Sequence, residues 1–232
     1  MGYALAKLLR TGVEKRIRKH DPRSTFPQNE HPWSYSVEAH YPKIREEFER
    51  LLPQLDNITN FDDILPGLIH GSDWKSFYLI AANKKIQEHQ LLCPETSGAL
   101  TEIPGLLNAF FSIFQPGVEV RPHQGPYAGI IRYHLGVIIP AGEVGIKVDG
   151  ITHRWEEGKS LLFDDRFTHE AWNKTDSIRV ILFVDLVRPL PQPLASINLA
   201  LLKIFKTSKA ARNAMNVIAN NQLRDPKHST TT

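Results

Sequence analysis

From Phe110 onward, the sequence is a series of short runs rich in β-branched and aromatic residues, and this feature most constrains the fold. Turn-forming pairs such as Pro-Gly, Asp-Gly and Glu-Gly separate the runs. Many short strands divided by glycine-containing turns predict an antiparallel β-sandwich or barrel. The runs are AFFSIF, VEV, GIIRYHLGVII, VGIKV, ITHRW, KSLLF and IRVILFVDLV.

One hairpin can be assigned within this β-rich region. Asp149 and Gly150 lie between VGIKV and ITHRW, and the Asp-Gly pair favours a type I′ turn between two antiparallel strands.

Helical patterns flank the β-rich region on both sides. In residues 38–52, Ile44, Phe48, Leu51 and Leu52 fall on one helical stripe, and after a proline-rich break at 189–193 the pattern is helical again. Nothing in the composition of 232 residues divides the chain, so we expect a single domain over residues 1–232. Its expected parts are a basic N-terminal segment (1–36), a mostly helical support region (37–104), a β core (105–189) and a C-terminal amphipathic helical segment (194–222).

Basic residues gather at the two ends of the sequence. The net charge is only +3, but residues 1–23 carry seven basic and two acidic side chains, and residues 203–227 carry six basic and one. The residues between them carry 15 basic and 22 acidic side chains. This distribution predicts an anionic surface as partner, either membrane lipid or nucleic acid, unless both ends are simply solvated helix faces.

The single cysteine, Cys93, allows no intrachain disulfide and favours a reducing compartment. No apolar run reaches the roughly 18 residues that a membrane span requires, and no secretory signal is recognisable. We therefore expect a cytoplasmic protein, either free or peripheral at the inner face of the membrane.

Two arginines lie within runs that otherwise read as buried strands. Side chains alternate along a strand, so Arg132 and His134 share one face of GIIRYHLGVII, and Arg179 opens IRVILFVDLV. A buried cation is costly unless an anion meets it. Two inward arginines therefore predict a barrel interior that holds a dianionic small molecule.

Two histidines lie at the ends of predicted strands. His123 follows one strand and His169 precedes another, 46 residues later. Neutral histidines in such positions can bind Fe(II), Zn or Cu in a jelly roll. Each histidine taken singly fits a hydrogen-bonded structural role as well, but together with the inward arginines they favour a metal site.

The sequence resembles the aspartyl/asparaginyl β-hydroxylase family, which comprises Fe(II)- and 2-oxoglutarate-dependent oxygenases and includes bacterial hydroxylases of lipid A and ornithine lipids. The resemblance covers roughly Trp74 to Pro189 and leaves both ends of the chain outside. It implies a mainly β fold with flanking helices, a double-stranded β-helix of the jelly-roll, cupin-like type. The motifs that carry it are HQGPYAGIIRYHLGVIIP, WEEGKSLLFDD and HEAW followed by IRVILFVDLVRP.

The resemblance implies a role for several residues. His123 and His169 match the two iron ligands, and Arg179 matches the arginine that binds the distal carboxylate of 2-oxoglutarate. Ser112 matches a serine that assists this arginine, and Trp74 aligns with a tryptophan beside the cosubstrate. The implied cofactors are Fe(II), 2-oxoglutarate as cosubstrate, and O2.

Arg132 and His134 match a pair near the other carboxylate of the cosubstrate and the iron. A carboxylate ligand would be expected two residues after His123, where this chain has Gly125. Some branches of the family share this glycine, which leaves iron with two protein ligands and an extra water. Asp165 is then a candidate for holding that water from outside the ligand shell, and capping of the loop by Asp164 or Asp165 is the alternative.

The expected function is hydroxylation of an unactivated C–H bond of a small-molecule or lipid substrate, with a membrane lipid as the first candidate. The runner-up is β-hydroxylation of an aspartyl or asparaginyl residue or of a free amino acid derivative. A non-catalytic cupin-type protein that binds a small anion is the alternative from another class. We expect no nucleic-acid partner, because residues 195–227 contain Phe205 as their only aromatic residue.

The C-terminal segment bears on the choice of substrate. Residues 194–219 are predicted to form one helix in which Lys203, Lys206, Lys209 and Arg212 make a basic band beside an apolar face. The apolar face comprises Leu194, Ile197, Leu201, Ile204 and Phe205. This face packs on the barrel or enters an anionic membrane interface, and the sequence leaves both alternatives open.

Overall fold

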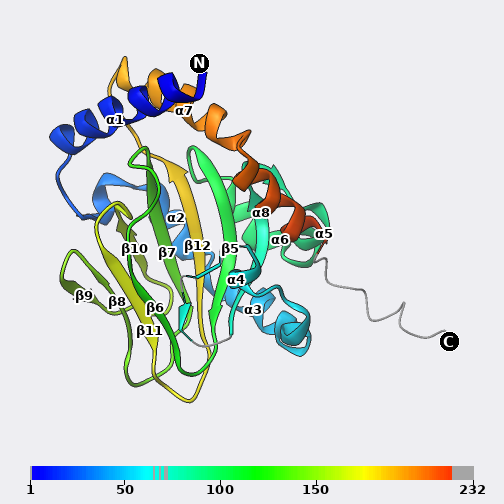
Figure 1. Ribbon diagram of the computed structural model, residues 1–232. Coiled ribbons are helices and arrows are strands. Elements are labelled where there is room, and N and C mark those ends of the chain that lie inside the picture. Colours follow the sequence, from blue (N-terminus) through cyan, green and yellow to red (C-terminus); the bar gives the residue numbers. More distant parts are fainter. Residues whose placement is uncertain (1, 65, 68, 71–72, 221–232) are drawn as a thin grey trace.

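The computed structural model describes residues 2–64, 66–67, 69–70 and 73–220 (Figure 1). Within these residues the strands form two antiparallel sheets, one of seven strands and one of five. The larger sheet has the order β1 (Thr25–Phe26), β10 (Ser160–Phe163), β7 (Ile130–Ile138), β12 (Arg179–Val187), β5 (Leu106–Phe114), β3 (Trp74–Ala81) and β4 (Lys84–Lys85). The smaller sheet has the order β2 (Ile69–His70), β6 (Val118–His123), β11 (His169–Asn173), β8 (Val144–Val148) and β9 (Ile151–His153).

From β5 to β12 the chain alternates between the sheets, with the β8–β9 hairpin as one unit of the smaller sheet. β5, β7, β10 and β12 belong to the larger sheet, while β6, β8, β9 and β11 belong to the smaller one. This alternation is the topology of a jelly roll, so the predicted fold class is confirmed. The predicted hairpin is also present, because Asp149 (φ 51°) and Gly150 (φ 79°) join β8 to β9 with the two positive φ angles of a type I′ turn.

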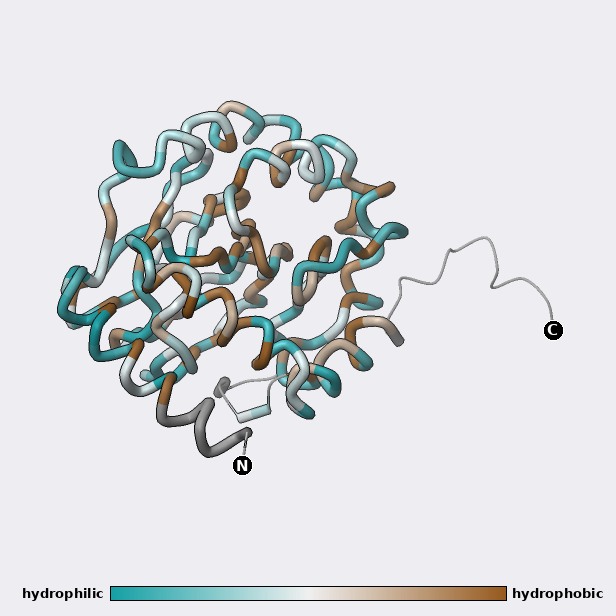
Figure 2. The backbone as a smooth tube through the Cα atoms, turned by 90° about the horizontal axis from the view of Figure 1, so that it is seen from above, coloured by the Kyte–Doolittle hydropathy of each residue, from teal (hydrophilic) through white to brown (hydrophobic). Residues whose placement is uncertain are grey.

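The alternation of side chains along β7 divides the core into two clusters. Tyr133 and Leu135 face outward from the barrel and pack in a cluster between the larger sheet and the helices. Arg132 and His134 face the inner side, where His134 contacts Phe183 of β12. Seen from above, the apolar segments gather toward the middle of the view, with mainly polar turns around them (Figure 2).

Helices cover the outer face of the larger sheet. Ile44 and Phe48 of α3 pack against this face, as the helical stripe in residues 38–52 predicts. Glu47 is also buried there, and its carboxylate accepts hydrogen bonds from the backbone N–H groups of Glu95 and Thr96 at the start of α6. The helices and the turn on this face are α2 (Trp33–Ala39), α3 (Tyr41–Leu51), α5 (Gln87–Leu92), α6 (Pro94–Leu100) and η2 (Leu52–Asn57). The other short elements are η1 (Gln28–Glu30) and α4 (Phe61–Ile64), and Phe61 of α4 packs against Trp74 in the inner cluster.

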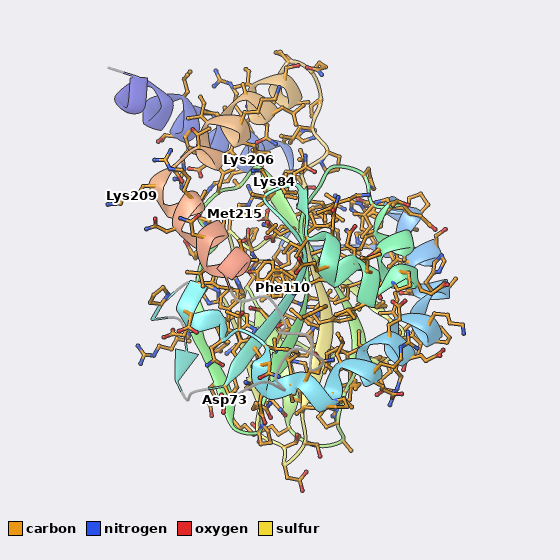
Figure 3. All side chains as sticks on the ribbon, turned by 90° about the vertical axis from the view of Figure 1, so that its right-hand side faces the viewer. Asp73, Lys84, Phe110, Lys206, Lys209 and Met215 are labelled. Carbon is orange, nitrogen blue, oxygen red and sulfur yellow. The ribbon has the colours of Figure 1, made fainter. Side chains whose placement is uncertain are left out.

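Two helices from distant parts of the sequence meet at one end of the barrel. Helix α1 (Gly2–His20) lies beside α7 (Leu194–Lys206) across the upper ends of the strands (Figure 1). Val13 and Ile17 of α1 share a buried cluster with Leu194 and Leu201 of α7. Helix α8 (Lys209–Asn220) then descends along the side of the barrel, where Met215 packs against the inner cluster that contains Phe110 (Figure 3).

The C-terminal segment differs from the prediction in two respects. It forms two helices rather than one, because Thr207 and Ser208 interrupt it and Ser208 Oγ accepts a hydrogen bond from the Ala211 N–H in the first turn of α8. The predicted apolar face is also divided, since Leu194 and Leu201 are buried while Ile197 and Ile204 are exposed. Residues 221 and 222 of the predicted segment lie outside the described residues.

Strand β3 was not expected. The predicted support region of residues 37–104 contains this eight-residue strand, which pairs with β5 and is buried throughout. Both faces of β3 are covered, so its sequence WKSFYLIA lacks the simple alternation that marks a half-buried strand. No helix in the described part of the chain is long and apolar enough to cross a bilayer.

Candidate functional site

The two predicted metal-binding histidines are brought together. His123 ends β6 and His169 begins β11, and the antiparallel pairing of these strands places the two residues opposite each other. Their ring centroids are 4.1 Å apart. Two residues separated by 46 positions in the sequence therefore form a single pair of imidazoles at one end of the smaller sheet.

Hydrogen bonding determines the tautomer of both imidazoles. His123 Nδ1 is 2.8 Å from the Arg121 carbonyl, and His169 Nδ1 is 2.9 Å from the Phe167 carbonyl. A carbonyl only accepts hydrogen bonds, so each Nδ1 carries the proton and each Nε2 keeps its lone pair. Burial and the nearby Arg132 cation lower the pKa of His169 to about 3, and burial is the main cause that lowers the pKa of His123. Both rings are then neutral at pH 7, which is the form that binds a transition metal.

The position two residues after His123 is closed to any side chain. A Cβ atom built on Gly125 would lie 2.0 Å from Asp165 Oδ2 and 2.2 Å from Asp165 Cγ. The Gly125 N–H also donates a hydrogen bond to the Asp165 carbonyl, at 2.6 Å. The Asp165 carboxylate therefore fills the space that a side chain at position 125 would occupy.

The Asp165 side chain is fully buried, and its carboxylate oxygens are poorly supplied with hydrogen bonds. Burial raises its pKa to about 6, although the Arg132 guanidinium acts in the opposite direction. Arg132 Nη2 lies 3.0 Å from Asp165 Oδ2, but within the described ranges neither carboxylate oxygen accepts a hydrogen bond of good geometry. These unsatisfied oxygens beside the imidazole pair fit a bound water. Loop capping falls to Asp164, which accepts a hydrogen bond from the Arg166 N–H.

Arg132 is neutralised within the protein. Its Nε lies 3.0 Å from Asp185 Oδ1, in addition to the ion pair with Asp165. Its Nη1 is 3.5 Å from His169 Nε2, so Arg132 joins the two carboxylates to the imidazole pair. The sequence contained a signal for Asp185, because Asp185 lies six residues after Arg179 in one strand and therefore shares its face.

Arg179 is in the opposite situation. Its side chain is 1% exposed, and its polar contacts are Ser112 O at 3.0 Å and Ser112 Oγ at 3.3 Å. Its guanidinium lies over the rings of Phe114 and Trp155. Among the residues that the structure describes, no carboxylate forms an ion pair with Arg179, and its Nε has no hydrogen-bond partner. Burial accordingly lowers the pKa of Arg179 well below its ordinary value.

Ser112 and Trp74 lie beside this unpaired cation. Trp74 Nε1 donates to Ser112 Oγ at 2.9 Å, so the same hydroxyl contacts both Trp74 and Arg179. The pairing of β5 with both β3 and β12 brings the three residues together. Trp74, which the alignment places beside the cosubstrate, therefore lies next to Ser112 and Arg179.

His134 supplies a second unsatisfied donor in the barrel interior. Trp155 Nε1 is a donor only and lies 3.3 Å from His134 Nδ1, so Nδ1 accepts and Nε2 carries the proton. His134 Nε2 is buried and has no partner among the described residues. Burial, followed by the charges of Arg132 and Arg179, lowers its pKa well below the ordinary value. No signal in the sequence pointed to Trp155, which reaches the site from the end of the β8–β9 hairpin.

The donor set fits the group that the resemblance implies. Two imidazole lone pairs suit a divalent metal, and the unpaired Arg179 and His134 Nε2–H suit the oxygens of an anionic cosubstrate. In the described part of the chain, no cluster of three or more His, Cys, Asp or Glu side chains could hold a metal.

Cavities of about 280 and 210 Å³ lie elsewhere, and both are lined by Arg188 and Pro189. The candidate site is therefore defined by its unsatisfied polar groups rather than by cavity volume.

Comparisons with known proteins agree with the motifs. The sequence model of the aspartyl/asparaginyl β-hydroxylase family matches residues 38–189. The chain is 42% identical over 178 residues to an ornithine lipid ester-linked acyl 2-hydroxylase of Rhizobium tropici, a match that covers 75% of this chain and 63% of that protein. It is 32% identical over 159 residues to the aspartyl/asparaginyl β-hydroxylase of Homo sapiens, covering 66% of this chain and 21% of that protein.

A prolyl-4-hydroxylase of Pseudomonas putida is among the similar solved structures. It has a TM-score of 0.42 and 14% sequence identity, and the match covers 65% of this chain and 88% of that one.

Proposed function

Because the chain belongs to the aspartyl/asparaginyl β-hydroxylase family, we propose that it is an Fe(II)- and 2-oxoglutarate-dependent oxygenase that hydroxylates an unactivated C–H bond of a membrane lipid. The observation that carries the cosubstrate assignment is the buried, unpaired Arg179. A buried charge without a counterion costs several kcal/mol, by order of magnitude, and a dianionic ligand would offset that cost.

His123 and His169 would hold the iron through their Nε2 atoms. Each ring is oriented by the hydrogen bond from its Nδ1 to a backbone carbonyl, which keeps the coordinating nitrogen deprotonated. Fe(II), 2-oxoglutarate and O2 together would supply the oxidising power for C–H hydroxylation. Asp165 would hold a water beside the iron, in the place where Gly125 leaves no ligand.

The cosubstrate would lie between the imidazole pair and Arg179. Arg179 and Ser112 Oγ would bind the distal carboxylate, and Trp74 orients that hydroxyl through its indole N–H. The His134 Nε2–H is available to donate to an oxygen nearer the iron. Arg132 is already paired with Asp165 and Asp185, so its main role would be to position Asp165 and the His169 ring.

The lipid assignment is supported by the higher identity to the Rhizobium tropici lipid hydroxylase, 42% against 32% for the human aspartyl/asparaginyl enzyme. This chain spans 63% of the length of the first protein and 21% of the second. β-Hydroxylation of aspartyl or asparaginyl residues is the second candidate, since the matched family carries that name.

The first experiment measures 2-oxoglutarate consumption and succinate formation with purified protein, Fe(II) and ascorbate. We expect turnover in the wild type and its loss in His123→Ala and His169→Ala, while the control His40→Ala, at a partly exposed histidine on the other side of the larger sheet, stays active. Arg179→Ala should mainly raise the KM for 2-oxoglutarate, by about 100-fold, because a charge-assisted pair inside the barrel is lost. Binding of 2-oxoglutarate without any turnover would favour a cupin-type binding protein instead.

The second experiment identifies the substrate. Lipid extracts from cells that express the wild type or His169→Ala would be compared by mass spectrometry for the gain of one oxygen. Lipid species that gain an oxygen only with the wild type support the proposal. Unchanged lipids together with hydroxylation of an aspartyl peptide would move the assignment to the second candidate.

A further inference from the structure

Helices α1 and α7 form a layer, here called the helical platform, across one end of the barrel (Figure 1). Its inner side is anchored by Val13 and Ile17 of α1 and by Leu194 and Leu201 of α7, which are buried together. Because these anchors come from opposite ends of the sequence, the platform exists only in the folded chain.

The platform borders the site. The loop of residues 124–129 directly follows His123, and both helices hold it. From α1, Arg10 donates a hydrogen bond to the Pro126 carbonyl. From α7, Asn198 Oδ1 accepts from Tyr127 OH at 2.7 Å, and Asn198 Nδ2 donates to the Gly129 carbonyl at 2.9 Å. The platform therefore lies at the end of the barrel where the imidazole pair is found.

The platform also exposes large aliphatic side chains. Of the nine large hydrophobic side chains exposed in the described region, four lie on these two helices. They are Leu9 (48% exposed), Ile197 (40%), Leu199 (47%) and Ile204 (48%). Ile197 and Ile204 are seven residues apart, so they share one side of α7. Leu9 instead continues the stripe of Val13 and Ile17, and Leu199 lines the cavity beside Trp33. Isolated exposed aliphatic residues are common, whereas two isoleucines exposed on one side of a helix that also carries exposed lysines indicate a surface that is covered in use.

The same surface is basic. Within the part of these helices whose side chains are described, Glu14 is the only acidic residue, and it pairs with Arg10 at 3.0 Å. The body of the protein, residues 24–202, carries 22 acidic and 15 basic side chains and so has the opposite sign. The exposed basic residues on the platform are Lys15, Arg16, Arg18, Lys19, Lys203 and Lys206, and Lys209 continues the series at the start of α8, where it points away from the barrel (Figure 3).

We propose that the helical platform docks on the surface of an anionic lipid bilayer, which brings the end of the barrel that holds the imidazole pair toward the membrane. This inference rests on the proposed function, because it explains how the barrel reaches a lipid substrate. Aliphatic side chains among cations match a bilayer interface, where isoleucine and leucine enter the acyl boundary and lysine and arginine meet the headgroups. A nucleic acid would match the cations but leave the aliphatic side chains without a partner.

The test is sedimentation of the full-length protein with vesicles of phosphatidylcholine alone or mixed with phosphatidylglycerol. Substitutions are used instead of deletion of α7, because deletion would expose the anchors of the platform. We expect the wild type to bind the anionic vesicles, more tightly at low salt than at physiological salt. Lys203→Glu/Lys206→Glu should weaken binding at least about 10-fold. The control Lys43→Glu/Lys159→Glu changes the net charge equally at exposed lysines away from the platform and should change binding by less than about twofold.

A second pair of variants separates lipid from other polyanions. Ile197→Gln/Ile204→Gln leaves the charge unchanged and should weaken binding at least about fivefold, because the aliphatic insertion is lost. Its control is Leu91→Gln on α5, at an aliphatic residue 80% exposed away from the platform. If only the lysine variant weakened binding, the platform would be a general polyanion site and the lipid assignment would be overturned.

The outcome is independent of catalysis. Sedimentation needs neither metal nor 2-oxoglutarate, and Arg179→Ala should bind vesicles like the wild type. If the wild type failed to sediment with anionic vesicles at low salt, the docking proposal would be overturned while the turnover assay could still support an oxygenase. If the protein bound vesicles but consumed no 2-oxoglutarate, the docking would stand and the proposed function would fail.

Discussion

At the scale of single residues, the two interior arginines play opposite parts. Arg132 is matched by Asp165 and Asp185, whereas Arg179 has no carboxylate partner in the described residues. The protein itself therefore compensates the charge of Arg132 but leaves the charge of Arg179 uncompensated. An unpaired buried charge is expected to lower the free energy of unfolding, and a bound anionic ligand would offset this cost.

This contrast predicts opposite effects of the same substitution. In metal-free protein, Arg179→Met should leave the free energy of unfolding unchanged or raise it by about 1–3 kcal/mol, because an uncompensated charge is removed. Arg132→Met should lower it by about 3–5 kcal/mol, because Asp165 and Asp185 lose their cation. Urea unfolding in EDTA measures both values. Destabilisation by Arg179→Met as large as that by Arg132→Met would show that Arg179 is already compensated within the protein.

A second residue-scale prediction concerns the space shared by Gly125 and Asp165. Gly125→Asp should lower the free energy of unfolding by at least about 2 kcal/mol, because its Cβ overlaps the Asp165 carboxylate. Gly125→Asp/Asp165→Ala should recover at least half of this loss, since the obstructing group is gone. Gly98→Asp serves as control, because a Cβ at Gly98 on α6 meets nothing within 4 Å. Denaturant unfolding of the four proteins tests the pair, and a double variant no more stable than Gly125→Asp would contradict the shared space.

At the scale of elements, hydrogen bonds from α7 hold the loop of residues 124–129, which follows His123, and we call this contact the clamp. Asn198 is fully buried. Its side chain accepts a hydrogen bond from Tyr127 OH and donates one to the Gly129 carbonyl. Residue 129 must be glycine for this contact, since a Cβ there would lie 1.9 Å from Asn198 Oδ1. The Asn198 side chain therefore joins α7 to this loop by two hydrogen bonds.

Asn198→Ala should lower the free energy of unfolding by about 2 kcal/mol, because it leaves a buried hydroxyl and a buried carbonyl without partners. It should also increase hydrogen exchange of the amides in residues 124–130, which lose their clamp. Ser196→Ala on the same helix removes an exposed hydroxyl that contacts only Gln192, and it should change stability by less than about 0.5 kcal/mol. Equal exchange rates in the two variants would argue against the clamp.

At the scale of the whole molecule, stability should depend on pH through the buried histidines. The folded-state pKa of His134 lies well below its ordinary value, and that of His169 is about 3. As the pH falls below about 6.5, the unfolded chain takes up protons that the folded chain does not, so the free energy of unfolding decreases. Asp165 acts in the opposite direction, since its folded-state pKa of about 6 lies above the ordinary value.

The contribution of one histidine can be isolated by substitution. In metal-free protein between pH 6.5 and 5, the slope of stability against pH should be shallower in His134→Gln than in the wild type, by up to about 1.4 kcal/mol per pH unit. The measurement is urea unfolding at several pH values in EDTA. His40→Gln, at a partly exposed histidine, is the control that should leave the slope nearly unchanged. Identical slopes in wild type and His134→Gln would mean that His134 is protonated equally in both states.

Much of the architecture follows from local properties of the sequence. The alternation of GIIRYHLGVII already places Arg132 and His134 on one face, and Asp149 and Gly150 already specify a hairpin. The motifs also led to His123 and His169, which the structure brings together. The side-chain period of a strand and the residue preferences of a turn depend on neighbours in the chain, so the sequence determines them without knowledge of the fold.

Other features are decided only by contacts between distant segments. The placement of strands and helices in space decides that Asp165 fills the space beside Gly125 and that Arg132 is neutralised while Arg179 is not. It also brings α1 and α7 together as one platform. Strand β3 was missed because the outer and inner clusters cover its two faces, so the alternation that would reveal it is absent. Burial and charge pairing depend on atoms that lie close in space but far apart in sequence, and for this reason only the tertiary structure could decide them.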